Sequence, residues 1–425
     1  MLDPLATVSI KANLLTFTSK VDPLDGVQEP RKHLIDKALS GLALSNEDSI
    51  HLAKSSPSEL ISICQAASIV RHRGKGVDVT FSPKVFIPLT KLCRDFCGYC
   101  TFRKTPSETN NLYMPEEEVV NLALEGQSLG CTEALFTLGD RPEQRYTLAK
   151  SWLQDRGYRT TIEYLQNSCS LLLHKTRLLP HSNPGILSHN QLKSLKSVNA
   201  SIGIMLETIS HRLTNVGMPH HRAPSKWPKV RLKTLNNAGL LKIPFTTGIL
   251  VGIGETRKER IEAILAIRES HLQHGHIQEI IVQNFRAKKA TPMSKHPNAS
   301  TEDLLWTVAM TRLVLGPNAN IQVPPNLNSR DYPLFLLAGI NDWGGVSPLT
   351  IDHVNPESPW PKLEELYNST KALGFRLKPR LPVYPEYIID RKQYLSGQIR
   401  DRIQGLVDST GYVKGGISRY VRVTN

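Results

Sequence analysis

Residues 86–100 read FIPLTKLCRDFCGYC, an apolar, strand-like run followed by three cysteines within eight residues. Thiolates at such short spacing are suited to ligating a metal cluster, because one loop brings them together. A four-iron cluster has four coordination positions, so Cys93, Cys97 and Cys100 would leave one iron open to a ligand other than protein. An open iron is a site for chemistry, and this stretch therefore predicts a reactive iron–sulfur centre.

Three other interpretations of the cysteine loop fit the sequence less well. A structural zinc site usually needs a fourth Cys or His nearby, and none follows within the next thirty residues. A disulfide framework is disfavoured, because the chain has 6 cysteines in 425 residues and no secretory segment at its start. A buried apolar position explains one cysteine but hardly three at these gaps. The remaining Cys64, Cys131 and Cys169 lie in apolar contexts, and we expect them to be reduced core residues of a cytoplasmic protein.

The composition is that of a globular protein, with 40% hydrophobic and 21% charged residues. No apolar run approaches the ~20 residues of a spanning helix, so no membrane association is expected. The net charge of +14 would suit nucleic acid, but the basic residues are spread along the chain and form no RNA-binding motif. We therefore expect no nucleic-acid partner. A basic surface could instead receive an acidic electron donor such as a flavodoxin or ferredoxin.

Strands and helices alternate after residue 76, and this order predicts a parallel α/β sheet. The units are too many for a doubly wound sheet and suit a TIM-type (β/α) barrel. The predicted strands are 79–81, 85–89, 131–137, 177–180, 200–206, 243–251, 279–284 and 320–323. The predicted helices between them are 115–130, 160–175, 188–196, 226–237, 256–274 and 301–315.

The segments outside the barrel differ in composition. Residues 1–30 show no periodicity and predict a disordered arm, and residues 31–74 predict a small helical cap. The barrel is expected over residues 75–370. Residues 371–425 are basic and Pro-rich and predict a C-terminal extension, with a peripheral tail over 396–425.

The spacing Cys-x3-Cys-x2-Cys, with the aromatic Tyr99 before its last cysteine, resembles the signature of radical S-adenosylmethionine (SAM) enzymes. The wider run FIPLTKLCRDFCGYCTF resembles the first subunit of FO synthase, a family that closes the deazaflavin ring of the F-420-type coenzyme. The resemblance covers roughly residues 75–360. It implies a [4Fe-4S] cluster on Cys93, Cys97 and Cys100, with SAM on the fourth iron.

The resemblance also implies which residues contact SAM. Tyr99 is placed near the adenine, and either Asp140 or Glu143 in the turn after the second strand would hold the methionine ammonium. Glu207 ends a predicted strand, and a carboxylate there can accept both ribose hydroxyls. The full set of implied cofactor residues is Tyr99, Gly139, Asp140, Glu143, Glu207, Gly252, Gly254 and Glu255.

Substrate residues are implied by three further segments at predicted strand ends. The loop at 180–185 contributes His181 and Asn183, and the strand at 280–286 contributes Asn284 and Arg286. A glycine-rich run at 339–347, which resembles the substrate end of the family, contributes the residues expected to hydrogen-bond and stack on a flat ring system. These are Asn341, Asp342 and Trp343.

The implied reaction converts the adduct of tyrosine's 4-hydroxybenzyl group with a ribitylaminouracil to 7,8-didemethyl-8-hydroxy-5-deazariboflavin (FO). SAM is cleaved to methionine and 5′-deoxyadenosine, ammonia is lost, and the second FO synthase subunit supplies the adduct. No general base is identifiable in the sequence. The alternatives are the second FO synthase subunit itself, a menaquinone-pathway or biotin synthase-like enzyme, a tRNA-modifying radical SAM enzyme, and an iron–sulfur electron carrier.

Overall fold

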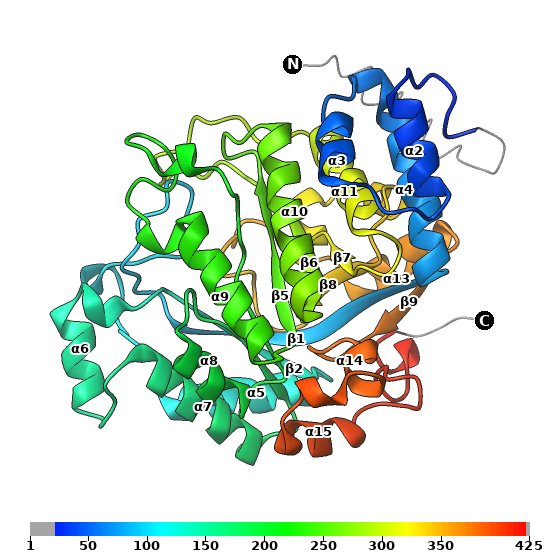
Figure 1. Cartoon of the computed structure of the whole chain (residues 1–425). Coiled ribbons are helices and arrows are strands. Elements are labelled where there is room, and N and C mark those ends of the chain that lie inside the picture. The colour runs from blue at the N-terminus through cyan, green and yellow to red at the C-terminus, as the bar shows by residue number, and fades with distance from the viewer. Residues whose placement is uncertain (1–21, 422–425) are drawn as a thin grey trace.

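The computed structural model describes residues 22–421, and its centre is a closed parallel β-barrel (Figure 1). Strands are hydrogen-bonded in the order β2-β3-β4-β5-β6-β7-β8-β1, and β1 also pairs with β2, which closes the ring. The predicted TIM-type barrel is confirmed. The strand bounds are β1 Asp78–Thr90, β2 Glu133–Leu138, β3 Leu179–Asn183, β4 Ser201–Gly203, β5 Phe245–Val251, β6 Ile277–Asn284, β7 Ile321–Gln322, β8 Asp342–Val346 and β9 Arg376–Pro379.

β1 is 13 residues long and merges the two strands predicted at 79–81 and 85–89. Its first half pairs with β8 on one side and β9 on the other, while its second half pairs with β2. Almost every residue of the strand is buried, as expected for a parallel strand covered by helices. The strand therefore leads directly from the barrel wall into the cysteine loop.

Helices cover the outside of the barrel, and several begin at a side chain that caps them. Thr256 and Glu259 form a capping box at α10, and Ser188 and Gln191 form another at α8. The helix bounds are α5 Glu116–Ser128, α6 Thr147–Gln154, α7 Thr161–Lys175, α8 His189–Lys196, α9 Pro228–Leu240, α10 Arg257–His274, α11 Thr301–Leu315, α12 Leu334–Leu337 and α13 Leu363–Ala372. No helix within residues 22–421 is both long and apolar enough to cross a membrane.

Short 3-10 turns complete the connections between these elements. They are η1 Pro57–Glu59, η2 Pro106–Glu108, η3 Pro142–Gln144, η4 His211–Thr214, η5 Pro224–Lys226, η6 Pro325–Asn328, η7 Lys392–Tyr394 and η8 Ile417–Arg419. Several of them lie in the loops at the carboxyl ends of the strands, where a barrel carries its active site.

A helical cap precedes the barrel and consists of α2 Arg31–Leu39, α3 Asn46–Leu52 and α4 Leu60–Lys75, drawn in blue in Figure 1. It packs on α11, where the Trp306 indole N–H donates to Ser55 Oγ at 2.7 Å. Of the arm predicted over residues 1–30, residues 1–21 lie outside the described part of the chain. Residues 22–30 form turns on the cap, where Val27 is buried and Ser62 Oγ donates to the Asp25 carbonyl at 3.0 Å.

The C-terminal extension contains α14 Pro385–Ile389 and α15 Gly397–Gln404 and closes the amino end of the barrel. Ser201 Oγ and Gln278 Nε2, from two barrel strands, donate to the Pro382 carbonyl at 2.6 and 3.0 Å. The tail predicted to be peripheral is instead packed against the barrel, since Arg402 on α15 donates to two carbonyls at the end of α7. Because the Pro382 carbonyl accepts hydrogen bonds from two barrel strands, we call the segment around Pro382 the floor of the barrel.

Candidate active site

The cysteine loop follows β1 directly and is held by two other loops of the barrel mouth. The Gly98 N–H donates to the Pro219 carbonyl at 2.7 Å, and the Met293 N–H donates to the Gly98 carbonyl at 3.0 Å. A Cβ on Gly98 would lie 3.2 Å from Pro219 Cα, so a side chain there would push these loops apart. The loop is thus fixed in place by its neighbours.

Cys93, Cys97 and Cys100 line one cavity of about 310 Å³ at the carboxyl ends of the strands, which we call the upper chamber. Cys93 Sγ accepts a hydrogen bond from the Asp140 N–H at 3.2 Å, a contact of the kind that tunes cluster sulfur. Burial raises the pKa of Cys93 to about 12, so a bound metal must supply the charge that keeps the thiolate deprotonated. Among residues 22–421 no three His, Cys, Asp or Glu side chains could hold a single ion. A four-iron cluster does not need that closeness, because each thiolate binds a different iron, and the donor set fits such a cluster.

The turn after β2 packs directly against the cysteine loop. A Cβ on Gly139 would lie 1.9 Å from the Leu92 carbonyl oxygen, so only glycine fits. The Arg94 N–H donates to the Asp140 carbonyl at 2.9 Å, and Arg94 Nε lies 2.8 Å from Asp140 Oδ1. A backbone hydrogen bond and an ion pair therefore join the two loops.

Asp140 is the acid of this turn that faces the upper chamber. Its Oδ2 accepts the Ile186 N–H at 3.0 Å, and burial raises the pKa of the carboxyl despite the nearby arginines. Glu143, the other acid predicted to hold SAM, accepts a hydrogen bond from Thr161 Oγ1 at 2.6 Å and does not line the chamber. Of the two predicted acids, the structure brings only Asp140 to the cysteines.

Glu207 faces the upper chamber from the loop after β4, where its φ is +65°. Its N–H donates to the Gly248 carbonyl at 3.0 Å, and the Leu250 N–H donates to its carbonyl at 2.9 Å, so β5 holds this left-handed residue. The carboxylate pairs with Lys226 and lies 3.7 Å from Arg231 Nη1. Burial would raise the pKa of Glu207, but these two cations hold it below its ordinary value. The predicted ribose acid is therefore an ionised carboxylate between two cations.

Tyr99 also faces the upper chamber. Its hydroxyl lies 2.9 Å from His220 Nε2, and the two rings meet edge to face with centroids 5.7 Å apart. Burial lowers the pKa of His220 to about 3, so the imidazole is neutral at physiological pH. The sequence indicated no function for His220, yet this residue orients the aromatic side chain of the cysteine loop.

A second cavity of about 170 Å³, which we call the lower chamber, lies deeper in the barrel and shares lining residues with the first. Alternate residues of a strand point inward, and strands β2, β3, β5 and β6 contribute side chains to both chambers. The predicted His181 and Asn183 line the lower chamber from β3. The other strands contribute Lys84 and Phe86 from β1, Glu133, Leu135 and Thr137 from β2, Thr246 from β5, Glu279, Ile281 and Gln283 from β6, and Gln322 from β7.

Asn284 and Arg286 line the upper chamber from the end of β6, as predicted. Asn284 exchanges two amide hydrogen bonds with Asn328 at 3.2 and 2.9 Å, and Arg286 Nε donates to the Leu327 carbonyl at 2.9 Å. Both side chains therefore fix the loop after β7 against the chamber.

The predicted cofactor turn at Gly252, Gly254 and Glu255 lies elsewhere. Gly252, Gly254 and Glu255 line a separate outer cavity of about 430 Å³ that contains none of the cluster cysteines. Glu255 accepts hydrogen bonds from the Gly252 and Ile253 N–H groups at 2.7 and 2.8 Å and from Arg260 Nε at 2.7 Å. The Glu255 carboxylate, which was predicted to bind the cofactor, instead accepts hydrogen bonds within its own turn.

Trp343 does not face a substrate, contrary to the prediction. The run at 339–347 contains strand β8, and Trp343 points outward from it towards α13. Its ring is fully buried, packs edge to face on Tyr332, and donates its indole N–H to Thr370 Oγ1 at 3.1 Å. Trp343 therefore stabilises the packing of α13 on the barrel wall.

Asn341 and Asp342 are also structural. Asn341 accepts hydrogen bonds from Arg312 Nη2 at 2.9 Å and from the Ile321 N–H at 3.0 Å, outside the barrel. Asp342 points inward below the chambers, where its Oδ2 lies 2.6 Å from Arg380 Nε. The prediction that these two residues contact the substrate is therefore wrong. They instead hold β7, β8 and the barrel floor together.

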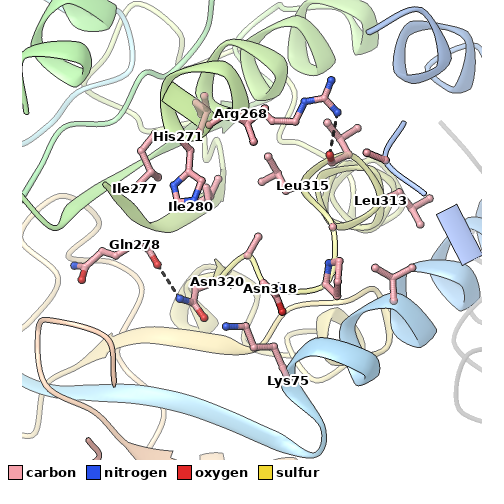
Figure 2. Close-up of a pocket in the computed structure, with 18 of the residues that line it drawn as sticks. Lys75, Arg268, His271, Ile277, Gln278, Ile280, Leu313, Leu315, Asn318 and Asn320 are labelled. Atoms are coloured by element: carbon pink, nitrogen blue, oxygen red, sulfur yellow. Dashed lines mark hydrogen bonds between the residues drawn. The ribbon is translucent and has the colours of Figure 1, made fainter. Parts of the chain in front are cut away.

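A larger cavity, about 860 Å³, is not part of this site (Figure 2). It is lined by Gln278 at the start of β6, by Asn320 just before β7, and by Lys75 at the end of the cap, and Figure 2 shows these side chains around the opening. These positions are at the amino ends of the strands, whereas barrel enzymes carry their chemistry at the carboxyl ends. Size alone would thus select the wrong end of the barrel.

Comparison with known proteins shows the family of this chain. Residues 87–267 match the Radical SAM superfamily model. The 7,8-didemethyl-8-hydroxy-5-deazariboflavin synthase of Methanopyrus kandleri is 49% identical over 336 residues, which cover 79% of this chain and 100% of that protein. This chain belongs to that synthase family.

Longer relatives agree with this membership of the deazariboflavin synthase family, and solved structures share the fold. The FO synthase of Nocardia farcinica is 45% identical over 93% of this chain, and the match spans 47% of that protein. The chain thus spans about half the length of such FO synthases. The fold is like that of the FeFe-hydrogenase maturase of Carboxydothermus hydrogenoformans, with a TM-score of 0.69 at 17% identity over 96% of each chain. It is also like methylornithine synthase, with a TM-score of 0.63 at 18% identity over 81% of this chain and 97% of that one.

Several chamber residues of this family member were missed in the sequence. Lys226 lies just before α9 and Arg231 lies within it, and neither belongs to a motif that the sequence analysis identified. Lys84, Glu133 and Glu279, by contrast, are charged residues inside otherwise apolar strands. A charge inside a buried parallel strand must have a partner, so these residues were a usable signal for a polar barrel interior.

Proposed function

We propose that this protein is a radical SAM synthase that closes the deazaflavin ring. It would convert the tyrosine-derived 4-hydroxybenzyl/ribitylaminouracil adduct to FO, with SAM cleaved to methionine and 5′-deoxyadenosine and with ammonia released. The observation that carries the proposal is the cysteine loop itself, which opens onto a two-level polar chamber in a chain of this synthase family.

Cys93, Cys97 and Cys100 would hold the [4Fe-4S] cluster and leave one iron for SAM. When bound, the cluster supplies the electron that cleaves SAM and so generates the 5′-deoxyadenosyl radical. Asp140 and Glu207 would receive the ammonium and the ribose hydroxyls of SAM, and both line the upper chamber. The closed barrel excludes water and other hydrogen donors from the chamber, which protects a radical reaction from side reactions.

A second component would supply the adduct. The longer FO synthases extend beyond the part that this chain matches, which fits a separate or fused second subunit that produces the substrate. The substrate is then a small molecule. We propose neither a nucleic-acid nor a membrane partner.

An acidic redox protein such as a flavodoxin or ferredoxin would reduce the cluster. Three arginines surround the Phe96 ring, directly before the ligand Cys97: the guanidinium carbons of Arg103, Arg222 and Arg145 lie 3.4, 4.9 and 5.0 Å from its centroid. Arg145 and Arg222 are exposed. Such a basic surface beside the cluster would attract an acidic donor. All six cysteines are free thiols, which supports a reducing, cytoplasmic location.

The function is tested by anaerobic reconstitution with iron and sulfide, followed by addition of reductant, SAM and the adduct. We expect FO fluorescence together with 5′-deoxyadenosine. Formation of 5′-deoxyadenosine without FO would keep the radical chemistry and reject the substrate. A parallel reaction with free tyrosine and the ribitylaminouracil, without the second component, should yield no adduct; an adduct there would identify the chain as the adduct-forming subunit.

A further inference from the structure

The floor of the lower chamber is charged, but its charges are satisfied within the protein. Lys84 Nζ lies 2.8 Å from Glu133 Oε1, and Arg380 Nη2 lies 2.7 Å from Glu279 Oε1. Arg380 Nε also pairs with Asp342 at 2.6 Å. These side chains are buried, so each cation is committed to its carboxylate partner. The floor therefore offers no free cation for a phosphate or carboxylate, and the chamber suits a neutral ligand.

Neutral hydrogen-bonding groups above this floor lack protein partners. Gln322, Asn183 and Gln283 all line the lower chamber, and none of their side chains makes a hydrogen bond within the described part of the chain. Thr137 Oγ1 is buried without a partner between the two levels. Amide and hydroxyl groups left open around one cavity are suited to a ligand that carries several donors and acceptors of its own.

The hydrogen-bond network assigns the tautomer of His181. Ser201 Oγ lies 2.6 Å from the Pro382 carbonyl, which can only accept, so the serine proton is directed there. Ser201 Oγ must therefore accept from His181 Nδ1, at 2.6 Å. Burial lowers the pKa of His181 to about 4, so the ring is neutral and its Nε2 carries a free lone pair. Gly203 leaves room beside that nitrogen, since a Cβ there would lie 3.2 Å from it.

One wall of the lower chamber is aromatic. The Phe86 and Trp360 rings are stacked, with centroids 5.3 Å apart and planes at 14°. The Trp360 indole N–H is occupied by the Thr350 carbonyl at 3.1 Å, so the ring offers its apolar surface rather than a donor. A flat heterocycle can pack on such a wall while its edge reaches the polar groups opposite.

We propose that the lower chamber binds the ribityl-bearing pyrimidine end of the substrate, with His181 Nε2 and the Gln322 amide hydrogen-bonding to it. This deepens the proposed function and rests on it. The ribitylaminouracil is neutral and rich in hydroxyl and imide groups, which matches a floor without free charge and a ring of unpaired amides. The hydroxybenzyl end then lies in the upper chamber, beside Tyr99 and the cysteines.

Binding of two probes to the reconstituted holoenzyme with SAM tests this assignment. The probes are the ribitylaminouracil and the same aminouracil with a methyl group in place of the ribityl chain. We expect wild type to bind the ribityl probe roughly a hundredfold more tightly, because the analogue lacks the ribityl hydroxyls that would bond to His181 Nε2 and to Gln322, at about tenfold for each hydrogen bond. His181→Leu and Gln322→Leu should each lose about tenfold of that preference. His181→Gln, whose amide oxygen can take the place of Nε2 as acceptor, should recover part of it.

Gln65→Leu is the matched control, because Gln65 is a buried glutamine of the cap, far from both chambers. It should keep the wild-type preference. Gln65→Leu should also still form 5′-deoxyadenosine from SAM with dithionite, since neither chamber is changed. Equal affinity of wild type for the two probes would overturn the assignment, and so would an unchanged preference in both leucine variants. Absence of FO from wild type with the adduct would instead overturn the proposed function, which keeps the two failures distinguishable.

Discussion

At the scale of single residues, two tryptophans near the predicted substrate segment differ in where their rings lie. Trp360 lies in the lower chamber and stacks on Phe86, whereas Trp343 is buried against α13. Residues of a strand alternate between the two faces of the sheet, so Asp342 points inward and its neighbour Trp343 points outward. The sequence analysis assigned no strand to residues 339–347, so it could not reveal that alternation.

This contrast yields a paired prediction. Trp360→Leu removes the aromatic wall, so the KM for the adduct should rise about tenfold while the unfolding free energy changes little. Trp343→Leu should leave KM unchanged but lower the unfolding free energy by about 3 kcal/mol, because it opens a cavity in the core. Steady-state FO kinetics and urea unfolding measure both. An unchanged KM in Trp360→Leu would exclude stacking on this ring.

His276 provides a residue-scale test of stability against pH. Its ring is fully buried without a hydrogen-bond partner among the described residues, and burial lowers its pKa to about 3. In the unfolded chain the ordinary pKa is about 6.5, so below that pH the unfolded state binds a proton that the folded state does not. The stability contributed by this group is therefore complete above pH 6.5 and is lost as the pH falls towards 3.

Between pH 7.5 and 5.5 this linkage should cost wild type about 1.4 kcal/mol relative to His276→Phe, which cannot titrate. Urea unfolding of both proteins at the two pH values gives the difference directly. His33→Phe, at an exposed position of the cap, is the control and should show no such relative change. A His276→Phe variant that loses stability in parallel with wild type would contradict the assigned pKa.

At the scale of elements, the cysteine loop combines the cluster ligands with a basic outer face. Reversing the charge of Arg145 and Arg222 should slow cluster reduction by flavodoxin roughly tenfold at low salt, and added salt should diminish the difference. Reduction by dithionite should not change, because this small reductant needs no docking surface. Lys392→Glu is the matched reversal at the opposite end of the barrel and should have no effect. A slower dithionite reaction would instead point to damage at the cluster.

The same scale separates the features that could be predicted from the sequence from those that could not. The cysteine loop and the strand–helix alternation were predictable because each depends on neighbours within a few residues, whereas the choice between Asp140 and Glu143 depended on contacts with Arg94 and Ile186. The outer position of the Gly252–Glu255 turn was not predictable, since Glu255 is satisfied by its own turn and by Arg260. The chamber floor was equally inaccessible, because Arg380 meets Glu279 across 101 residues of sequence.

At the scale of the whole molecule, Arg380 joins the C-terminal extension to the barrel. Arg380→Leu would leave Glu279 and Asp342 buried without their cation, so the unfolding free energy should fall by about 3–5 kcal/mol. Arg376→Leu, four residues earlier, removes a cation whose side chain is 62% exposed and paired with Asp78, and should cost less than about 1 kcal/mol. Equal losses in the two variants would show that the floor contributes no special stability.

The position of β1 between β8 and β9 has a consequence for biogenesis. Thr80 on β1 hydrogen-bonds to Asp342 262 residues later, and Asp78 pairs with Arg376 298 residues later. During synthesis the first half of β1 stays unpaired until β8 and β9 have been made. Contacts between residues so far apart in the sequence also form slowly. The cysteine loop follows β1 directly, so the nascent chain exposes its three thiols in a barrel that is still open on one side. We expect delivery of iron and sulfide to be easiest in that interval, before β8 and β9 close the barrel wall beside β1.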